Sequence, residues 1–132
     1  MKTYLALVEK EADSAFGVIF PDVPGCFSAA DQADEILSNA TIALRLWAED
    51  MPLPTASRHE TIISRPEIKE ALSNGAYLIS VPLIENDTAV VRANVTFERG
   101  MLRAIDEAAK QRGVTRSAFL ANAARHEIEA KH

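Results

Sequence analysis

The first part of the chain carries short apolar runs separated by polar segments. Residues 3–8 and residues 15–20 are apolar runs joined by a short polar connection, a pattern that predicts a β-hairpin. The sequence Pro21-Asp22-Val23-Pro24-Gly25 follows and predicts a tight turn, because proline restricts φ and glycine tolerates positive φ. Residues 26–30 then predict a third short strand.

A helical spacing of apolar residues replaces the strand pattern after this point. Between Ile36 and Trp47 the apolar residues recur at the spacing of one helix face, which predicts an amphipathic helix. Asp31 is the expected N-cap, and further acidic residues follow in the first turn, where the helix dipole favours them. The helix must end before Pro52, which cannot continue it.

The middle of the chain returns to strand character. Residues 55–75 are polar and mixed, and Pro66 is suited to open a short helix within them. Residues 76–84 predict a fourth strand, in which Pro82 belongs on a sheet edge or near a strand end because proline cannot donate a ladder hydrogen bond. The order β-β-β-α-β predicts a domain over residues 1–87, a small sheet with one packed helix.

The last part of the chain alternates and then becomes helical. Apolar and polar residues alternate over residues 91–97, which predicts a strand with one apolar and one polar face. Helical spacing follows over residues 99–112 and ends at Gly113, a suitable residue after a helix C-terminus. Thr115 is a suitable N-cap for a second helix. Residues 88–132 therefore predict a strand-helix-helix domain, and the whole chain is expected to be α+β.

The strand-helix-helix domain needs a partner to be stable. One strand has two unpaired edges, and about forty residues rarely bury a sufficient core. Antiparallel pairing with the same strand of a second copy would complete a ladder and let four helices share a core. A two-stranded ribbon fits the DNA major groove, where Arg recognises guanine and Asn recognises adenine. We therefore expect base contacts from the polar face of the strand, Arg92, Asn94 and Thr96.

The start of the second helix adds a phosphate-binding feature. Its free backbone N–H groups and the side chains of Thr115, Arg116 and Ser117 are suited to hold the DNA backbone. Each feature also has a simpler interpretation, a solvated sheet face for the alternation and an ordinary helix cap for Thr-Arg-Ser. Together, on a unit of this length with net positive charge, they favour DNA binding.

Charge divides the chain unevenly. Residues 90–132 carry eight basic and five acidic residues, a net charge of +3, whereas residues 1–89 carry −8. A basic segment on an acidic body indicates two different partners, one of them nucleic acid, although chance scatter of surface charge is the alternative.

No catalytic or metal-binding constellation emerges from the sequence. The histidines are scattered without ligand-like spacing, and there is no glycine-rich phosphate loop. We therefore expect no enzymatic activity, no metal and no cofactor. Cys26, the single cysteine, cannot form an internal disulfide, and no apolar run is long enough to span a membrane. These features predict a soluble cytoplasmic protein.

Two family resemblances extend this interpretation. Residues 90–132 resemble the ribbon-helix-helix DNA-binding proteins. Residues 16–26, which read F-G-V-I-F-P-D-V-P-G-C, together with the helix after them and the M-P-L-P sequence at residues 51–54, resemble the HicB antitoxins over residues 3–56. That family combines a partial RNase H-like domain without nuclease activity with a C-terminal DNA-binding domain. Residues 29–33 depart from the usual glycine and threonine, so we expect a changed turn and an unchanged fold.

The resemblance implies a function. HicB proteins bind and block HicA, a small basic ribonuclease toxin, and repress their shared operon, here as a homodimer through the C-terminal strand, with pairing into tetramers left open. Our hypothesis for toxin contact is the turn residues Asp22, Pro24 and Phe27, although turn structure also explains the prolines. Two other classes remain: an orphan ribbon-helix-helix regulator with another partner, and a nuclease on the RNase H-like half, which no motif supports.

Overall fold

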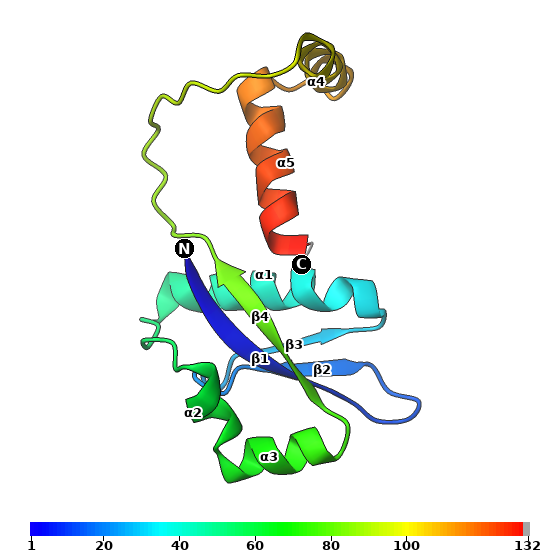
Figure 1. Cartoon of the computed structure of the whole chain (residues 1–132), viewed down its shortest axis with the longest axis vertical. Helices are drawn as coiled ribbons and strands as arrows, with labels where there is room; N and C mark the ends of the chain where they lie inside the picture. Colours follow the sequence, from blue (N-terminus) through cyan, green and yellow to red (C-terminus); the bar gives the residue numbers. More distant parts are fainter. Residues whose placement is uncertain (131–132) are drawn as a thin grey trace. The chain divides into compact units, whose positions relative to one another are not determined.

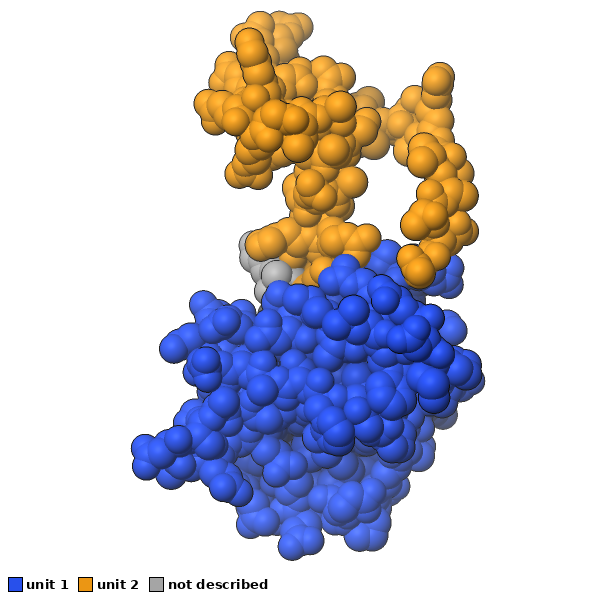
Figure 2. Space-filling model, turned by 180° about the vertical axis from the view of Figure 1, so that it is seen from behind, with its two compact units in different colours: residues 1–85 blue, residues 86–132 orange. Residues whose placement is uncertain are grey.

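The chain forms two compact units in the computed structural model, which describes residues 1–130. Unit 1 comprises Met1–Glu85, and unit 2 begins at Asn86 (Figure 2). This division falls two residues before the boundary expected from the sequence. Lys131 and His132, counted in the expected C-terminal domain, lie outside the described residues.

Unit 1 is built on a four-stranded antiparallel sheet (Figure 1). All four strands expected from the sequence are present, which confirms the strand pattern. The spatial order is β3-β2-β1-β4, so β4 is an edge strand and Pro82 occupies an edge as predicted. The strands are β1 (Lys2–Lys10), β2 (Phe16–Ile19), β3 (Phe27–Ala30) and β4 (Tyr77–Leu83).

One face of the sheet packs against α1 (Ile36–Asp50), the long helix expected from the sequence. Alternate residues of β1 point into this layer, and the helix contributes residues at helical spacing. The expected N-cap is wrong: a short 3-10 turn, Ala33–Glu35, precedes α1, and neither its N-cap Gln32 nor the N-cap of α1 forms a side-chain capping bond. The centre of this core consists of Tyr4, Ala6, Val8, Val18, Ala30, Ile36, Ala40, Leu44 and Val81.

Two short helices, α2 (His59–Ile63) and α3 (Pro66–Ser73), pack on the opposite face. The helix opened by Pro66 was predicted, whereas α2 falls in a segment that was described only as polar and mixed. Ile62 and Ile68 of these helices are buried against Leu7 of β1. The described residues of this second core come from β1, β4, the two helices and the connection before β4. The helices α2 and α3 therefore cover the half of the sheet that β1 and β4 form.

Unit 2 contains α4 (Arg99–Gln111) and α5 (Arg116–Ala130), joined through Gly113 at φ +68°. Both helices match the predicted spans. Residues 84–98 form neither helix nor strand in the single chain, so the strand expected over residues 91–97 is not present. A strand requires a neighbouring strand for its hydrogen bonds, and one copy of unit 2 offers none. No helix within residues 1–130 combines the length and apolar character needed to cross a membrane.

Candidate functional site

Asp22 lies in the turn between β2 and β3, and its carboxylate holds three segments of unit 1 together. One oxygen accepts a hydrogen bond from the Ser57 backbone N–H at 2.6 Å. The other accepts from Ser57 Oγ at 2.8 Å and from Arg65 Nη2 at 2.9 Å. Arg65 also donates to the carbonyl of Pro21 at 3.2 Å. The turn is thereby tied to the segment after α1 and to the start of α3.

Burial and hydrogen bonding act in opposite directions on the Asp22 carboxyl. The side chain is 7% exposed, and burial alone would raise its pKa. The hydrogen bonds from Ser57 and Arg65, with the positive charge of Arg65, outweigh burial and hold the pKa of Asp22 below its ordinary value. Asp22 is therefore an ionised anchor inside unit 1. Of the three turn residues expected to contact a toxin, Pro24 and Phe27 present exposed surface.

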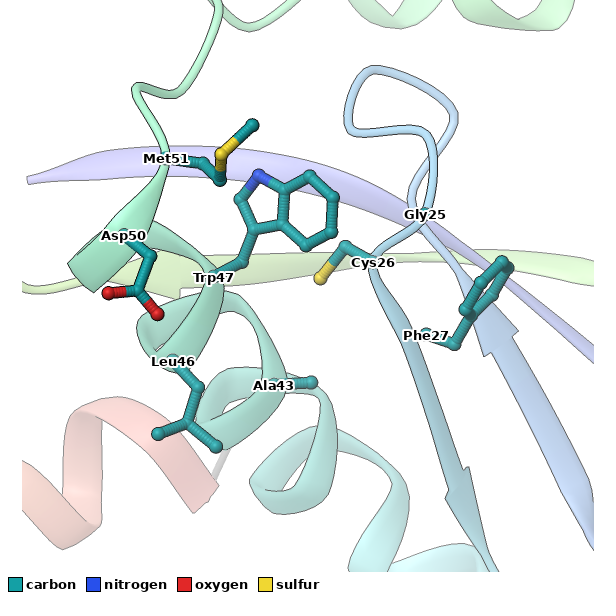
Figure 3. A pocket seen from close by; sticks show the side chains of 8 residues that line it. All are labelled: Gly25, Cys26, Phe27, Ala43, Leu46, Trp47, Asp50 and Met51. Atoms are coloured by element: carbon teal, nitrogen blue, oxygen red, sulfur yellow. The ribbon is translucent and has the colours of Figure 1, made fainter.

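A hollow of about 470 Å³ opens between the start of β3 and the C-terminal end of α1. Gly25, at φ +92°, approaches the Trp47 ring so closely that an added Cβ would lie 3.0 Å from the ring carbon Cη2. Figure 3 shows Cys26 directed toward α1, while the Phe27 ring points to the other side of the strand. The hollow is lined by Gly25, Cys26, Phe27, Ala43, Leu46, Trp47, Asp50 and Met51.

The other face of β2 and β3 forms what we call the open sheet face, made of Gly17, Ile19, Phe27 and Ala29. The register pairs Gly17 with Ala29 and Ile19 with Phe27, so these four side-chain positions share one face of the sheet. All four are exposed, Phe27 by 67% and Ile19 by 37%. Leu7, which pairs with Ile19 on the next strand, is covered by α2 and α3. The open sheet face thus begins where that cover ends.

A second hollow, of about 240 Å³, adjoins the β1–β2 hairpin. Glu9 pairs with Gly17 in the register, so its side chain lies on the same face as the open sheet face. Lys10 alternates to the opposite face, where its ammonium lies 5.6 Å from the centre of the Phe16 ring. The hollow is lined by Glu9, Lys10, Glu11, Ala71, Asn74, Gly75 and Ala76.

In unit 2 the residues predicted to contact bases, Arg92, Asn94 and Thr96, are all exposed in the irregular segment before α4. The single chain does not arrange them on one sheet face, because that arrangement requires a paired strand. The apolar residues that alternate with them are also exposed: Val91 by 83%, Val95 by 68% and Phe97 by 38%.

The residues predicted to hold phosphate lie together at the start of α5. Thr115 is its N-cap, accepting a hydrogen bond from the Ala118 N–H at 3.1 Å, and Ser117 is exposed. Arg116 is engaged within the unit: its Nε and Nη2 each donate to one oxygen of Asp106 on α4, both at 2.8 Å. The hydrogen bond and charge of Arg116 hold the pKa of the Asp106 carboxyl below its ordinary value.

The sequence as a whole matches a known protein family. The model described as the HicB_like antitoxin of bacterial toxin-antitoxin systems matches residues 4–124. The chain belongs to the HicB-like antitoxin family. This family acts by binding a toxin and not by catalysis, in agreement with the expectation that the chain is not an enzyme. Within residues 1–130 no cluster of three or more His, Cys, Asp or Glu side chains is arranged to hold a metal ion.

Relatives of this HicB-like chain include proteins of several sources. An uncharacterised 14.9 kDa protein of Haemophilus phage HP1 is 32% identical over 109 residues, which cover 79% of each chain. The crystal structure of the Burkholderia pseudomallei antitoxin HicB is 28% identical, covers all of both chains and has a TM-score of 0.53. A chain of the HicA3–HicB3 toxin-antitoxin complex is 29% identical, with a TM-score of 0.50 over 63% of this chain and 99% of that one.

Sequence reasoning missed the partners of two site residues in this HicB-like chain. Ser57 and Arg65 lie 35 and 43 residues from Asp22, and no local pattern links them. Asp106 and Arg116 are only 10 residues apart, on consecutive helices whose joining turn was recognised. Asp106 and Arg116 carry opposite charges on either side of the predicted turn between two helices. Their ion pair could therefore have been predicted from the sequence.

Proposed function

We propose that the chain is an antitoxin that neutralises a HicA-type toxin through unit 1, acts in the cytoplasm, and represses its own operon through a ribbon-helix-helix domain built from residues 88–132 of two copies. The observation that carries the first half is the family match together with the likeness to a chain of a HicA3–HicB3 complex. The second half rests on the sequence pattern and the exposed surface of unit 2.

Unit 1 has the size and charge suited to the toxin-binding half. The match to the toxin complex spans 63% of this chain, close to the share that Met1–Glu85 occupies in 132 residues. Unit 1 carries 13 acidic and six basic residues, a net charge of −7. An acidic surface of this kind raises the association rate with a basic partner and disfavours acidic ones.

Unit 2 has the features of a domain completed by a second copy. Within its described residues, the buried hydrophobic residues are Ile105 and Ala109, too few for a stable core. Val91 and Val95 expose apolar side chains beside a backbone without ladder hydrogen bonds. Antiparallel pairing of residues 91–97 between two copies would satisfy that backbone and bury the apolar face against the helices.

The same pairing would place two sets of Arg92, Asn94 and Thr96 on the outer face of the ribbon. Such a ribbon enters the major groove, where these side chains suit the edges of guanine, adenine and thymine. Thr115 and Ser117, with the N–H groups at the start of α5, would hold the phosphates on either side.

Co-expression with the product of the neighbouring toxin-type gene tests the antitoxin half. We expect the two proteins to purify as one complex and the chain to restore growth that the toxin arrests. A chain that neither captures the toxin nor restores growth would instead favour an orphan regulator whose unit 1 has a different partner.

Gel-shift titration on the operator tests the DNA-binding half. We expect Arg92→Ala and Asn94→Ala each to cost about 1–3 kcal/mol and to relax sequence preference, because each removes one set of base contacts. Lys110→Ala, on the last turn of α4, is the control for loss of a basic side chain outside the ribbon. Wild-type affinity in both ribbon variants would exclude the ribbon as the element that reads sequence.

A further inference from the structure

The helical cover of the sheet in unit 1 is incomplete. One face is covered by α1, and the other is covered by α2 and α3 only over β1 and β4. The open sheet face is the remainder, formed by Gly17, Ile19, Phe27 and Ala29. A sheet usually buries its apolar face against another element, and an exposed apolar patch marks an interaction surface.

The shape of the open sheet face suits a protein partner. Gly17 and Ala29 are opposite one another and carry almost no side chain, so the backbone is accessible there. An added Cβ on Gly17 would meet only the Glu9 carbonyl oxygen, at 3.9 Å. Ile19 and Phe27 form the next cross-strand pair, and their exposed apolar side chains border this flat area on one side. A side chain of the partner can therefore reach the backbone level and contact the Phe27 ring from one side.

Charge around the open sheet face indicates the sign of that partner. Glu9 and Glu11 line the hollow of about 240 Å³ beside it. Lys10, which lies between Glu9 and Glu11 in the sequence, has its ammonium over the Phe16 ring, and Phe16 belongs to the α1 side of the sheet. The two carboxylates are thus available to a Lys or Arg side chain entering from the open sheet face.

A second copy of unit 1 is a poor occupant for the same reason. Two surfaces that each carry Glu9 and Glu11, on units of net charge −7, would repel one another. A protein surface with an apolar centre and a basic rim would bury its centre against Ile19 and Phe27 and would be attracted by the carboxylates of Glu9 and Glu11.

We propose that the open sheet face is the surface on which the basic toxin docks, with an apolar toxin side chain against Ile19 and Phe27 and a basic one between Glu9 and Glu11. The inference rests on the proposed function and adds the location of the contact. Phe27 stays a toxin-contact residue, whereas Asp22 holds the turn that leads into β3 and does not contact the toxin.

The test compares two substitutions that each replace an exposed apolar side chain by arginine and so make the same change of charge. Phe27→Arg alters the open sheet face, where Phe27 is 67% exposed. Leu46→Arg alters a residue of α1 that is 56% exposed and borders the hollow of about 470 Å³ from the helix side. The probe is a catalytically inactive form of the neighbouring gene's product, titrated calorimetrically into the full chain. We expect Phe27→Arg to raise the Kd about tenfold or more and Leu46→Arg to leave it within about twofold, because central apolar contacts carry most of the affinity.

The carboxylates are tested by Glu9→Gln combined with Glu11→Gln. This variant should slow association and reduce its dependence on salt, whereas Glu49→Gln with Asp50→Asn, the same charge change on α1, should have a smaller effect. Ala29→Arg replaces Phe27→Arg if circular dichroism shows that the latter does not fold.

The outcomes separate this inference from the proposed function. Failure of the wild-type chain to bind the toxin overturns both. Tight wild-type binding that Phe27→Arg and Ala29→Arg leave unchanged overturns the location alone. Light scattering measures whether Phe27→Arg dissociates an oligomer of the chain. Dissociation without a change in toxin Kd would show that a second copy, and not the toxin, occupies the open sheet face.

Discussion

Asp22 shows how one buried carboxylate can organise a surface loop. Its oxygens accept hydrogen bonds from Ser57 and Arg65, so the turn that leads into Phe27 at the start of β3 is fixed by residues distant in the sequence. Removing the carboxylate would leave the Ser57 N–H and the Arg65 guanidinium without their partner, and unsatisfied groups of this kind cost more than the net value of the bonds.

We predict that Asp22→Ala lowers the free energy of unfolding at neutral pH by about 2–3 kcal/mol. The folded state lowers the pKa of Asp22, so its contribution is fully present above the unfolded-state pKa of about 3.9 and is lost as pH falls through the lower folded-state value. Urea unfolding at pH 7 and at successively lower pH measures this. Asp31→Ala, at an exposed aspartate, is the control, and an equal loss in both variants would contradict the anchoring role.

Gly25 and Gly75 provide a matched pair at the same scale. Both adopt positive φ, +92° and +100°, but an added Cβ at Gly25 meets Trp47 whereas one at Gly75 meets open space. We predict that Gly75→Ala costs about 1–2 kcal/mol from the backbone alone. Gly25→Ala should cost about 1 kcal/mol more because the Trp47 ring must move. If urea unfolding shows the same loss of unfolding free energy in both variants, the Trp47 ring moves aside without an energetic cost.

The helices of unit 2 are joined by an ion pair that would compete with the proposed DNA contact of Arg116. Arg116 was predicted to hold phosphate, but one edge of its guanidinium, formed by Nε and Nη2, is bound to Asp106. We predict that Asp106→Asn strengthens binding to all DNA sequences, because it releases Arg116 and removes a negative charge near the phosphates. Gel shifts over a range of salt measure this. Glu107→Gln, the same charge change at the next residue, should have the smaller effect; an equal effect would indicate net charge alone.

Elements with a long or strictly periodic pattern could be predicted from the sequence. The four strands of unit 1 and the helices α1, α4 and α5 lie close to their predicted spans. The five-residue helix α2 was missed because it is too short to show a period, although its Ile62 is fully buried. The strand expected over residues 91–97 is not present in the single chain, and the proposal that a second copy completes it stays a prediction.

Site residues followed the same rule. The Arg92, Asn94 and Thr96 pattern is local and could be read directly, and it stays a prediction for the paired state. The open sheet face could not be foreseen, because the sequence does not reveal how far α2 and α3 extend over the sheet. Phe27 entered the hypothesis only as a neighbour of the turn.

At the scale of the whole molecule, the two units should differ in how their stability depends on protein concentration. Unit 1 has a core on each side of its sheet, whereas the described part of unit 2 buries little. We predict that the melting temperature of unit 2 rises with concentration and that of unit 1 does not, because only unit 2 is proposed to be completed by a second copy. Val95→Lys should lower the unit 2 transition, and Asn94→Ala should not. Concentration-independent melting throughout would exclude the paired domain.

Cys26 offers a way to observe one unit without the other. The thiol is 3% exposed in the core under α1, and burial raises its pKa, so the reactive thiolate is scarce in the folded chain. No other cysteine occurs in the sequence. The rate at which a maleimide labels the protein therefore measures how often unit 1 opens, and slower labelling in the presence of toxin would report its binding in mixtures too complex for calorimetry.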